Sequence, residues 1–288
     1  MITIEHEQPR DGSGEGFRDC VSVDFCDGEN GLFGLVRVTR APGAPRARGS
    51  AIILSGEKVV EQLELESEQP LDDGRLADAG AIEIATVVPL ERWSLEVSGG
   101  AASLKLDATA VSPPLELAGG VAEPAGIARY EQLCEMTGVI TVDGRSRDAR
   151  CIGRRAHSWG EFAWDRIDRW RTLYAASGTG RAISVTTARP AGSHGHGEEL
   201  RAASLVDASR TEQFESVRIS TVWDRHGAPA KAGLELDLPG DEIPTRMGGE
   251  IVGGTRSERG DHSVSLSFFR WSLEGVPALG AYEVLERR

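Results

Sequence analysis

The sequence predicts an all-β protein built from two antiparallel β-barrel or sandwich domains in tandem. Short runs of alternating or β-branched residues recur along the 288-residue chain, separated by Gly, Asp and Pro, as is typical of antiparallel strands. Segments with a helical period are nearly absent. The tandem Pro113-Pro114 cannot lie in a central strand, and it separates two halves that supply similar numbers of strands.

The first half of the chain contains a series of predicted strands divided by turn-forming residues. Pro42 and Pro45 interrupt one connection, and Asp72-Asp73-Gly74 is a turn signal in another. The predicted strands are Val21–Phe25, Leu32–Thr39, Ala51–Leu54, Val59–Glu66, Ala81–Val88, Trp93–Val97 and Ser103–Ala108.

A Pro- and Gly-rich segment gives the strongest internal punctuation of the chain. It runs from Ser112-Pro113-Pro114 to Pro124 and Gly126. We therefore predict a domain boundary near residue 120, with an N-terminal β domain at 1–120 and a C-terminal β domain at 121–288.

The second half opens with a predicted hairpin, Tyr130–Val142 and Arg145–Arg155, joined by Asp143-Gly144. Asp-Gly between alternating runs is a strong hairpin signal. A two-residue turn pairs Val142 with Arg145, which places His157 opposite Tyr130. A three-residue loop would shift the register by one and place Glu131 opposite His157. In both cases we expect His157 to have a hydrogen-bonding neighbour on the facing strand.

The rest of the second half continues the strand pattern, with one exception. The segment Trp159–Trp170 has Trp164 and Ile167 one helical turn apart, so a short helix is expected there. The later predicted strands are Trp170–Ala176, Ala182–Ala188, Val217–Asp224, Leu234–Leu238, Gly249–Gly253, Ser263–Trp271 and Ala281–Leu285.

Composition excludes several classes of partner. The formal net charge is −13, which repels phosphate backbones and anionic membrane surfaces, so neither nucleic acid nor membrane insertion is expected. The polar, acidic start from Met1 to Gly16 does not resemble a secretory signal, and no apolar run is long enough to span a bilayer. We expect a cytoplasmic protein whose partner is a small hydrophobic ligand. The oligomeric state stays open.

The four cysteines are expected to be free thiols. Cys20 and Cys26 lie roughly 20 Å apart along one predicted strand, and the hairpin register separates Cys134 from Cys151. No CxxC pair indicates a structural zinc site. The loop Gly192–Glu199 contains a His-x-His sequence, but nothing orders it, so we expect no metal.

Indole rings and ionisable groups cluster around His157. Three of the six tryptophans lie within this short window. Indoles supply apolar area with one donor each, which suits a ligand pocket, although a tryptophan cluster can equally be plain core. A serine hydrolase is disfavoured because no G-x-S-x-G sequence is present. The catalytic candidates are His157, Asp165, Asp168, Tyr130 and Glu131, and the ligand-binding candidates are Trp159, Trp164, Trp170, Ser158 and Arg155.

The same segment resembles the signature of one family. The matching residues are Tyr130-Glu131-Gln132, Gly138, Val142-Asp143-Gly144 and the run from Gly153 to Gly160 that contains His157-Ser158-Trp159-Gly160. This signature is similar to that of the carotenoid 1,2-hydratase (hydroxyneurosporene synthase)-like superfamily, which also includes fungal survival-factor proteins and decalin-forming Diels–Alderases. The resemblance implies two tandem lipocalin-like (calycin-type) barrels, a ligand pocket near their junction, and no metal or organic cofactor.

The chain departs from that signature at one position. The family pattern reads Arg-Asp-His-Ser-Trp-Gly, whereas the acidic position here is Ala156. If that acid is catalytic in the hydratases, Asp165 or Asp168 would have to replace it, or the chemistry differs.

Two functions follow from these observations. One is a cofactor-free enzyme that hydrates or cyclises an isoprenoid- or polyketide-like molecule, that is, a hydratase or a cyclase. The other is a non-catalytic carrier of a lipid or another hydrophobic small molecule, because a lipocalin-like fold alone does not imply catalysis.

Overall fold

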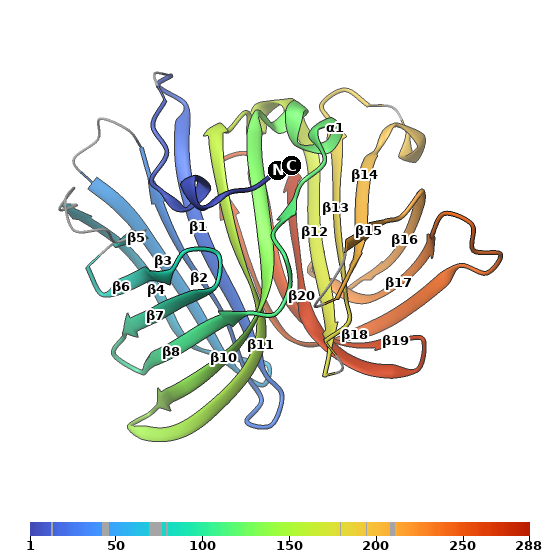
Figure 1. The fold of residues 1–288 in the computed structure, drawn as a ribbon. Coiled ribbons are helices and arrows are strands. Elements are labelled where there is room, and N and C mark those ends of the chain that lie inside the picture. Colours follow the sequence, from blue (N-terminus) through green and yellow to red (C-terminus); the bar gives the residue numbers. More distant parts are fainter. Residues whose placement is uncertain are drawn as a thin grey trace. The chain divides into compact units, whose positions relative to one another are not determined.

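The computed structural model describes residues 1–12, 14–41, 46–68, 77–78, 80–178, 180–193, 195–207 and 211–288. The chain forms two compact units: Met1–Glu116 with Gly126–Phe162, and Leu117–Ala125 with Ala163–Arg288. Each unit contains one antiparallel sheet that curls into a half-barrel (Figure 1). The predicted all-β fold with two lipocalin-like domains is therefore confirmed.

In the first unit, the strands follow the order β4-β3-β2-β1-β11-β10-β8-β7-β6-β5, and the short β9 pairs with β10. A 3₁₀ turn, η1, precedes them. The elements are η1 (Ile4–Glu7), β1 (Phe17–Asp27), β2 (Leu32–Arg40), β3 (Arg46–Ser55), β4 (Lys58–Glu68), β5 (Ala77–Asp78), β6 (Ile82–Val88), β7 (Arg92–Ser98), β8 (Ala102–Ala110), β9 (Leu115–Glu116), β10 (Ile127–Val142) and β11 (Arg145–Glu161).

Alternation along the strands gives the first unit its core. Val21, Val23 and Phe25 on β1 point to the same face, because successive side chains of a strand alternate. They pack with Leu95 of β7 and Cys151 of β11 in one buried cluster. A fully buried side chain of this size contributes about 1.5–3 kcal/mol relative to exposure.

The second unit has the strand order β15-β14-β13-β12-β20-β19-β18-β17-β16. Its core includes the stacked rings of Phe269 and Trp271, whose centroids lie 4.7 Å apart. The elements are α1 (Gly119–Ala122), η2 (Glu123–Ala125), η3 (Trp164–Arg166), β12 (Ile167–Ser177), β13 (Ala182–Pro190), η4 (His196–Glu198), β14 (Leu200–Val206), β15 (Thr211–Gln213), β16 (Ser216–Trp223), β17 (Pro229–Asp237), β18 (Thr245–Arg259), β19 (His262–Leu273) and β20 (Val276–Arg287).

The predicted register of the hairpin is correct. Val142 pairs with Arg145 and Tyr130 pairs with His157. Asp143 and Gly144 both have positive φ, +49° and +74°, which is the backbone that a two-residue turn needs. The local Asp-Gly signal was thus sufficient to align both strands.

The predicted domain boundary near residue 120 needs correction. The hairpin β10–β11 belongs to the first sheet, where β11 pairs with β1 and β10 pairs with β8. Only Leu117–Ala125 joins the second unit before the chain returns to the first, which ends at Phe162. Prolines mark where a strand stops, whereas the boundary of a domain depends on long-range strand pairing that local punctuation does not encode.

The structure also bears on three smaller expectations. The helix expected at Trp159–Trp170 is reduced to the 3₁₀ turn Trp164–Arg166, because the flanking residues extend β11 and β12. The four cysteines are free, as predicted, and all four are buried. Across the part of the chain that the structure describes, no helix is long and apolar enough to cross a membrane.

Candidate functional site

The interior face of β1, β10 and β11 contains the candidate site of the first unit. Tyr130 and His157 are directly opposite each other, and Asp19 is opposite Trp159. Arg155 and His157 follow Cys151 at alternating positions of β11, so they share the face of the apolar core. The sequence therefore directs these ionisable and aromatic side chains into the half-barrel.

A buried histidine–aspartate pair lies at the centre of the site. The Nε2 atom of His157 is 2.5 Å from Oδ1 of Asp19, and Nδ1 is 2.9 Å from the backbone oxygen of His6. A carbonyl oxygen can only accept, so Nδ1 carries a hydrogen. Both contacts are hydrogen bonds only when Nε2 also carries a proton, shared with Asp19. The pair thus offers a site for one proton more than a neutral imidazole carries.

The partners of Asp19 favour its ionised form. It forms an ion pair with Arg40 and accepts a 3.0 Å hydrogen bond from the backbone N–H of Arg10. Burial acts to raise the pKa of Asp19, but the hydrogen bond and charge of His157, together with Arg40, outweigh it, so the pKa lies below its ordinary value. The pKa of His157 lies below its ordinary value, because burial lowers it by more than the hydrogen bond and charge of Asp19 raise it. When both ring nitrogens are protonated, Asp19 stabilises the imidazolium, and burial makes that imidazolium a stronger acid than a free one.

A second polar group surrounds Glu7. Its carboxylate accepts hydrogen bonds from the Tyr130 hydroxyl, from Trp93 Nε1 at 2.8 Å and from Thr86 Oγ1 at 3.2 Å. Arg155 Nη1 lies 2.9 Å from the Glu7 carboxylate and donates to the Tyr130 oxygen at 2.7 Å. Burial is the main cause that raises the pKa of Tyr130, so its phenol stays protonated and available as a donor.

Aromatic rings line this region. The ring of Trp159 contacts that of His157 edge-on, with centroids 5.2 Å apart, and that of Tyr130 at 6.2 Å. His6 lies 5.9 Å from the same indole, and the guanidinium of Arg10 lies 4.9 Å from its centroid. Electron-rich ring faces beside a proton-holding pair can stabilise a developing cation.

The N-terminal segment from His6 to Arg10 covers the site. It supplies the backbone oxygen that faces His157, the carboxylate of Glu7 and the N–H that binds Asp19. The side chains of His157 and Arg155 are 0% exposed as a result. Figure 1 shows this segment, with η1, as the dark blue turn at the start of the chain.

One sequence expectation about His157 was wrong. We expected Tyr130 or Glu131 to supply its hydrogen bond, but the partner is Asp19 on β1. The hairpin register was correct, yet His157 also has a neighbouring strand on its other side, and the diagonal position there carries the carboxylate. One sequence signal could have identified Asp19. It continues the alternating series of Val21, Val23 and Phe25, so it lies on the same interior face.

Two predicted site residues lie on the opposite face of the same sheet. Glu131 and Ser158 alternate with the interior positions. Glu131 forms ion pairs with Arg129 and Arg154, each at 3.3 Å, and Ser158 accepts a 3.0 Å hydrogen bond from Arg129. Neither residue is on the face that His157 occupies.

The remaining predicted residues belong to the second unit. Trp164 and Trp170 form an edge-on pair with centroids 5.8 Å apart. Asp168 accepts a hydrogen bond from the backbone N–H of Gly192, and the backbone oxygen of Asp165 accepts one from Arg287. Their participation in one pocket with His157 stays a prediction.

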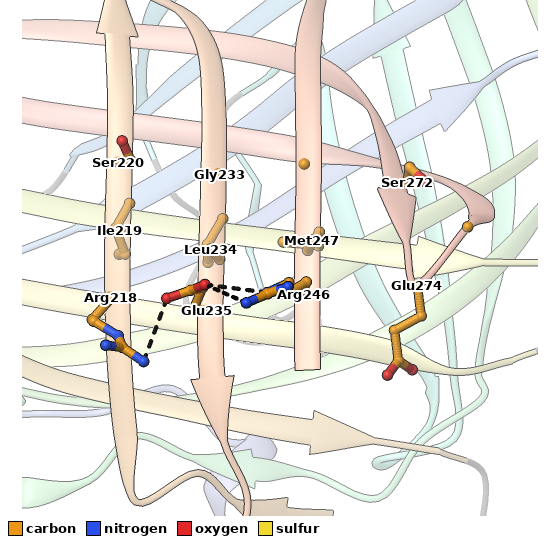
Figure 2. A pocket seen from close by; sticks show the side chains of 12 residues that line it. Arg218, Ile219, Ser220, Gly233, Leu234, Glu235, Arg246, Met247, Ser272 and Glu274 are labelled. Carbon is orange, nitrogen blue, oxygen red and sulfur yellow. Dashed lines mark hydrogen bonds and ion pairs between the residues drawn. The ribbon is translucent and has the colours of Figure 1, made fainter. Parts of the chain in front are cut away.

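The second unit also has an open hollow on the outer face of its sheet. Small residues, Ser220, Gly233, Gly248 and Ser272, follow one another across neighbouring strands of that face. The hollow measures about 670 Å³. Figure 2 shows one wall of it, where Glu235 pairs with Arg218 at 3.4 Å and with Arg246 at 3.1 Å. Glu235 and both arginines are exposed to solvent as well as paired, unlike the fully buried His157 and Arg155.

No group of three or more His, Cys, Asp or Glu side chains that could hold a metal ion occurs among the residues that the structure describes. His194 of the His-x-His loop lies outside those residues.

Comparison with known proteins supports a family assignment. A family model described as a domain of unknown function (DUF7064) matches residues 3–287. The chain belongs to this family. A search of curated proteins finds no match to its sequence.

Solved structures share the fold. An AttH-like protein from Nitrosomonas europaea has a TM-score of 0.70 at 14% identity, with 94% of this chain and 92% of that one aligned. Kievitone hydratase from Nectria haematococca gives 0.65 at 14%, covering 99% and 92%. CghA with Sch210972 gives 0.66 at 14%, covering 94% and 88%. These neighbours have the fold that the resemblance around His157 implied. At this identity they establish the fold alone.

Proposed function

We propose that the protein is a cofactor-free enzyme that hydrates or cyclises a hydrophobic, isoprenoid- or polyketide-like small molecule. The observation that carries the proposal is the buried pair of His157 and Asp19, which can share a proton beside the rings of Tyr130 and Trp159. Strongly perturbed ionisable groups inside an apolar half-barrel are typical of active sites. A hydratase among the structures of the same fold supports the same class of chemistry.

In a hydration, the Nδ1–H of His157 would protonate an alkene carbon of the substrate. The alkene electron pair forms the new C–H bond, and the cation at the neighbouring carbon faces the rings of Trp159 and Tyr130. Water then forms the C–O bond and returns its proton to Nδ1. Asp19 stays on Nε2 throughout, where it stabilises the imidazolium.

In a cyclisation, no proton would be gained or lost overall. The same rings would hold a flexible chain in a reactive conformer, and the gain would come from orientation. The polar groups would then fix the position of the substrate and supply little of the affinity.

The Ala156 departure is compatible with this scheme. Ala156 is opposite Glu131 on β10 and alternates with Arg155 and His157, so its side chain faces away from the interior. Asp19 approaches His157 from β1 and provides the carboxylate instead. Asp165 and Asp168 of the second unit remain the alternative acids. We infer a cytoplasmic location, which the free cysteines of the chain favour.

The test is turnover in water enriched in ¹⁸O. The full-length protein is incubated with a panel of isoprenoid alkenes and linear polyenes, and with any small molecule that co-purifies in native mass spectrometry. Hydration gives a product that carries ¹⁸O, and cyclisation gives an isomer of equal mass with a different retention time. Asp19→Asn and His157→Ala should abolish product formation. Asp148→Asn, an exposed position on β11, is the matched control and should retain it.

Two results would contradict the proposal. Folded Asp19→Asn and His157→Ala variants that form product at the wild-type rate would exclude this pair. A co-purifying ligand that the wild type and both variants bind equally, without conversion by any of them, would indicate the carrier function.

A further inference from the structure

Glu7 is held in a cradle of four donors that come from four strands. Thr86 lies on β6, Trp93 on β7, Tyr130 on β10 and Arg155 on β11. Both carboxylate oxygens are engaged, Oε1 by Tyr130 and Arg155 and Oε2 by Trp93 and Thr86. The strands thus supply donors to both oxygens of a carboxylate, and the carboxylate itself comes from a short turn outside the sheet.

The guanidinium in this cradle is incompletely satisfied. Arg155 is 0% exposed and lies between the rings of Trp93 and Tyr130, 4.9 and 5.1 Å from their centroids. Among the residues that the structure describes, its Nε and Nη2 atoms have no hydrogen-bond partner. An arginine usually binds a carboxylate through two parallel N–H groups, whereas Glu7 is engaged through Nη1 alone. A buried donor without a partner is costly, so the cradle retains capacity for a better-placed anion.

The segment that carries Glu7 lies outside the sheet. It is a four-residue 3₁₀ turn, Ile4–Glu7, and its backbone is not part of the sheet. Its neighbours Glu5 and Gln8 are exposed. A ligand carboxylate that entered the cradle would restore the hydrogen bonds lost by Glu7, so the exchange would leave no buried charge unpaired.

We propose that Thr86, Trp93, Tyr130 and Arg155 bind the carboxylate of an otherwise apolar ligand, and that Glu7 occupies this cradle when no ligand is bound. The inference rests on the proposed function, because it assigns the substrate class of the same site. The apolar part of the ligand would contact Trp159, which His6 and Arg10 now cover. Departure of the same segment also frees Nδ1 of His157 from the His6 carbonyl.

The test measures binding and does not require turnover. The probe is cis-parinaric acid, a fluorescent polyene carboxylate, compared with its methyl ester and with a long-chain alkyl phosphate. We expect Glu7→Gln to bind the acid about tenfold more tightly than the wild type, because the competing group has lost its charge. Glu5→Gln, the exposed neighbour on the same turn, should match the wild type. The methyl ester should bind all three proteins equally weakly, and Arg155→Met should abolish the preference for the acid.

Hydrogen exchange on the unmodified protein provides a second measurement if Glu7→Gln does not fold. A saturating concentration of cis-parinaric acid should accelerate amide exchange in residues 3–10, and its methyl ester should not. In this segment the amides of His6 and Gln8 donate to the backbone oxygens of Thr3 and Glu5. Equal binding of acid and ester, failure of the acid to bind, or unchanged exchange in residues 3–10 would overturn the proposal. If the alkyl phosphate binds more tightly than cis-parinaric acid, the cradle is a site for phosphate groups and the assignment to a carboxylate is wrong.

The outcomes separate this inference from the proposed function. Acid binding that responds to Glu7→Gln without any hydration or cyclisation product would keep the cradle and reject the enzyme. Product formation together with acid binding that is unchanged in Glu7→Gln would keep the enzyme and reject the cradle.

Discussion

Replacing Asp19 with Asn should destabilise the protein by about 3 kcal/mol at pH 7. The substitution keeps the shape and an acceptor for the Arg10 amide, but it removes the charge that faces Arg40 and His157. A hydrogen bond to a charged group contributes about 1.5–3 kcal/mol, and two are lost. The lower end applies to Arg40 because its side chain is 13% exposed and water screens part of the interaction. It applies to His157 because burial lowers the pKa of the imidazole, which weakens its positive charge at pH 7.

The effect should depend on pH with a defined sign. The folded-state pKa of Asp19 lies below its ordinary value, which is close to that of an unfolded chain. Such a group contributes stability that is fully present above the unfolded pKa and is lost as the pH falls through the folded one. The difference in unfolding free energy between wild type and Asp19→Asn should therefore be constant near neutrality and narrow below about pH 4.

Urea unfolding at several pH values measures this difference. The control is Asp148→Asn, an exposed carboxyl on β11, which should change the free energy of unfolding by less than about 0.5 kcal/mol. A loss below about 1 kcal/mol for Asp19→Asn at pH 7, or a difference that does not narrow in acid, would refute the assignment of Asp19 as a buried, ionised partner of His157.

Two further predictions concern packing and thiol chemistry. Gly280→Ala should destabilise by about 3 kcal/mol or more, because a Cβ there would lie 1.9 Å from the backbone oxygen of Tyr174, whereas Gly233→Ala, with nothing within 4 Å, should cost far less; urea unfolding of both variants decides this. Burial raises the pKa of Cys134 and Cys151 to about 12, so neither thiol should react with a disulfide reagent at pH 8 until the protein is unfolded, and labelling of the folded protein at either position would contradict the burial argument.

Local signals in the sequence predicted what depends on local geometry. Asp143-Gly144 fixed the register of sixteen residue pairs from Val142↔Arg145 to Ile127↔Gly160, because two residues with positive φ leave one way to join the strands. The apolar alternation identified the core face. The prediction of Arg155, His157, Tyr130 and Trp159 as site residues placed them together for the same reason, since all four lie on the interior face of the hairpin.

The sequence did not reveal the residues that β1 and the N-terminal turn contribute to the site. Asp19 reaches His157 across the β1–β11 pairing, which joins residues more than a hundred positions apart. Glu7 lies in a polar segment without periodicity, so no pattern distinguishes it from its exposed neighbours. A local turn specifies one pairing, whereas the neighbour on the other edge of a strand depends on the energetics of the whole sheet.

The second unit contains a network of the same four residue types, Arg, Glu, Tyr and Thr, and the contrast explains why we assign binding to the first unit. Arg171 donates through Nε to Thr187 at 3.0 Å, through Nη1 to the Tyr282 hydroxyl at 3.5 Å and through Nη2 to Glu199. All three nitrogens of that guanidinium have partners, and its carboxylate directly precedes β14 of the same sheet.

Arg155, by contrast, leaves two buried nitrogens without partners among the described residues and takes its carboxylate from a turn outside the sheet. A satisfied network specifies and rigidifies a core, so the one in the second unit needs no ligand to explain it. A buried ion pair adds little stability over apolar packing, and an incomplete one adds less. An incompletely satisfied cradle beside the His157–Asp19 pair is therefore better explained by binding than by folding.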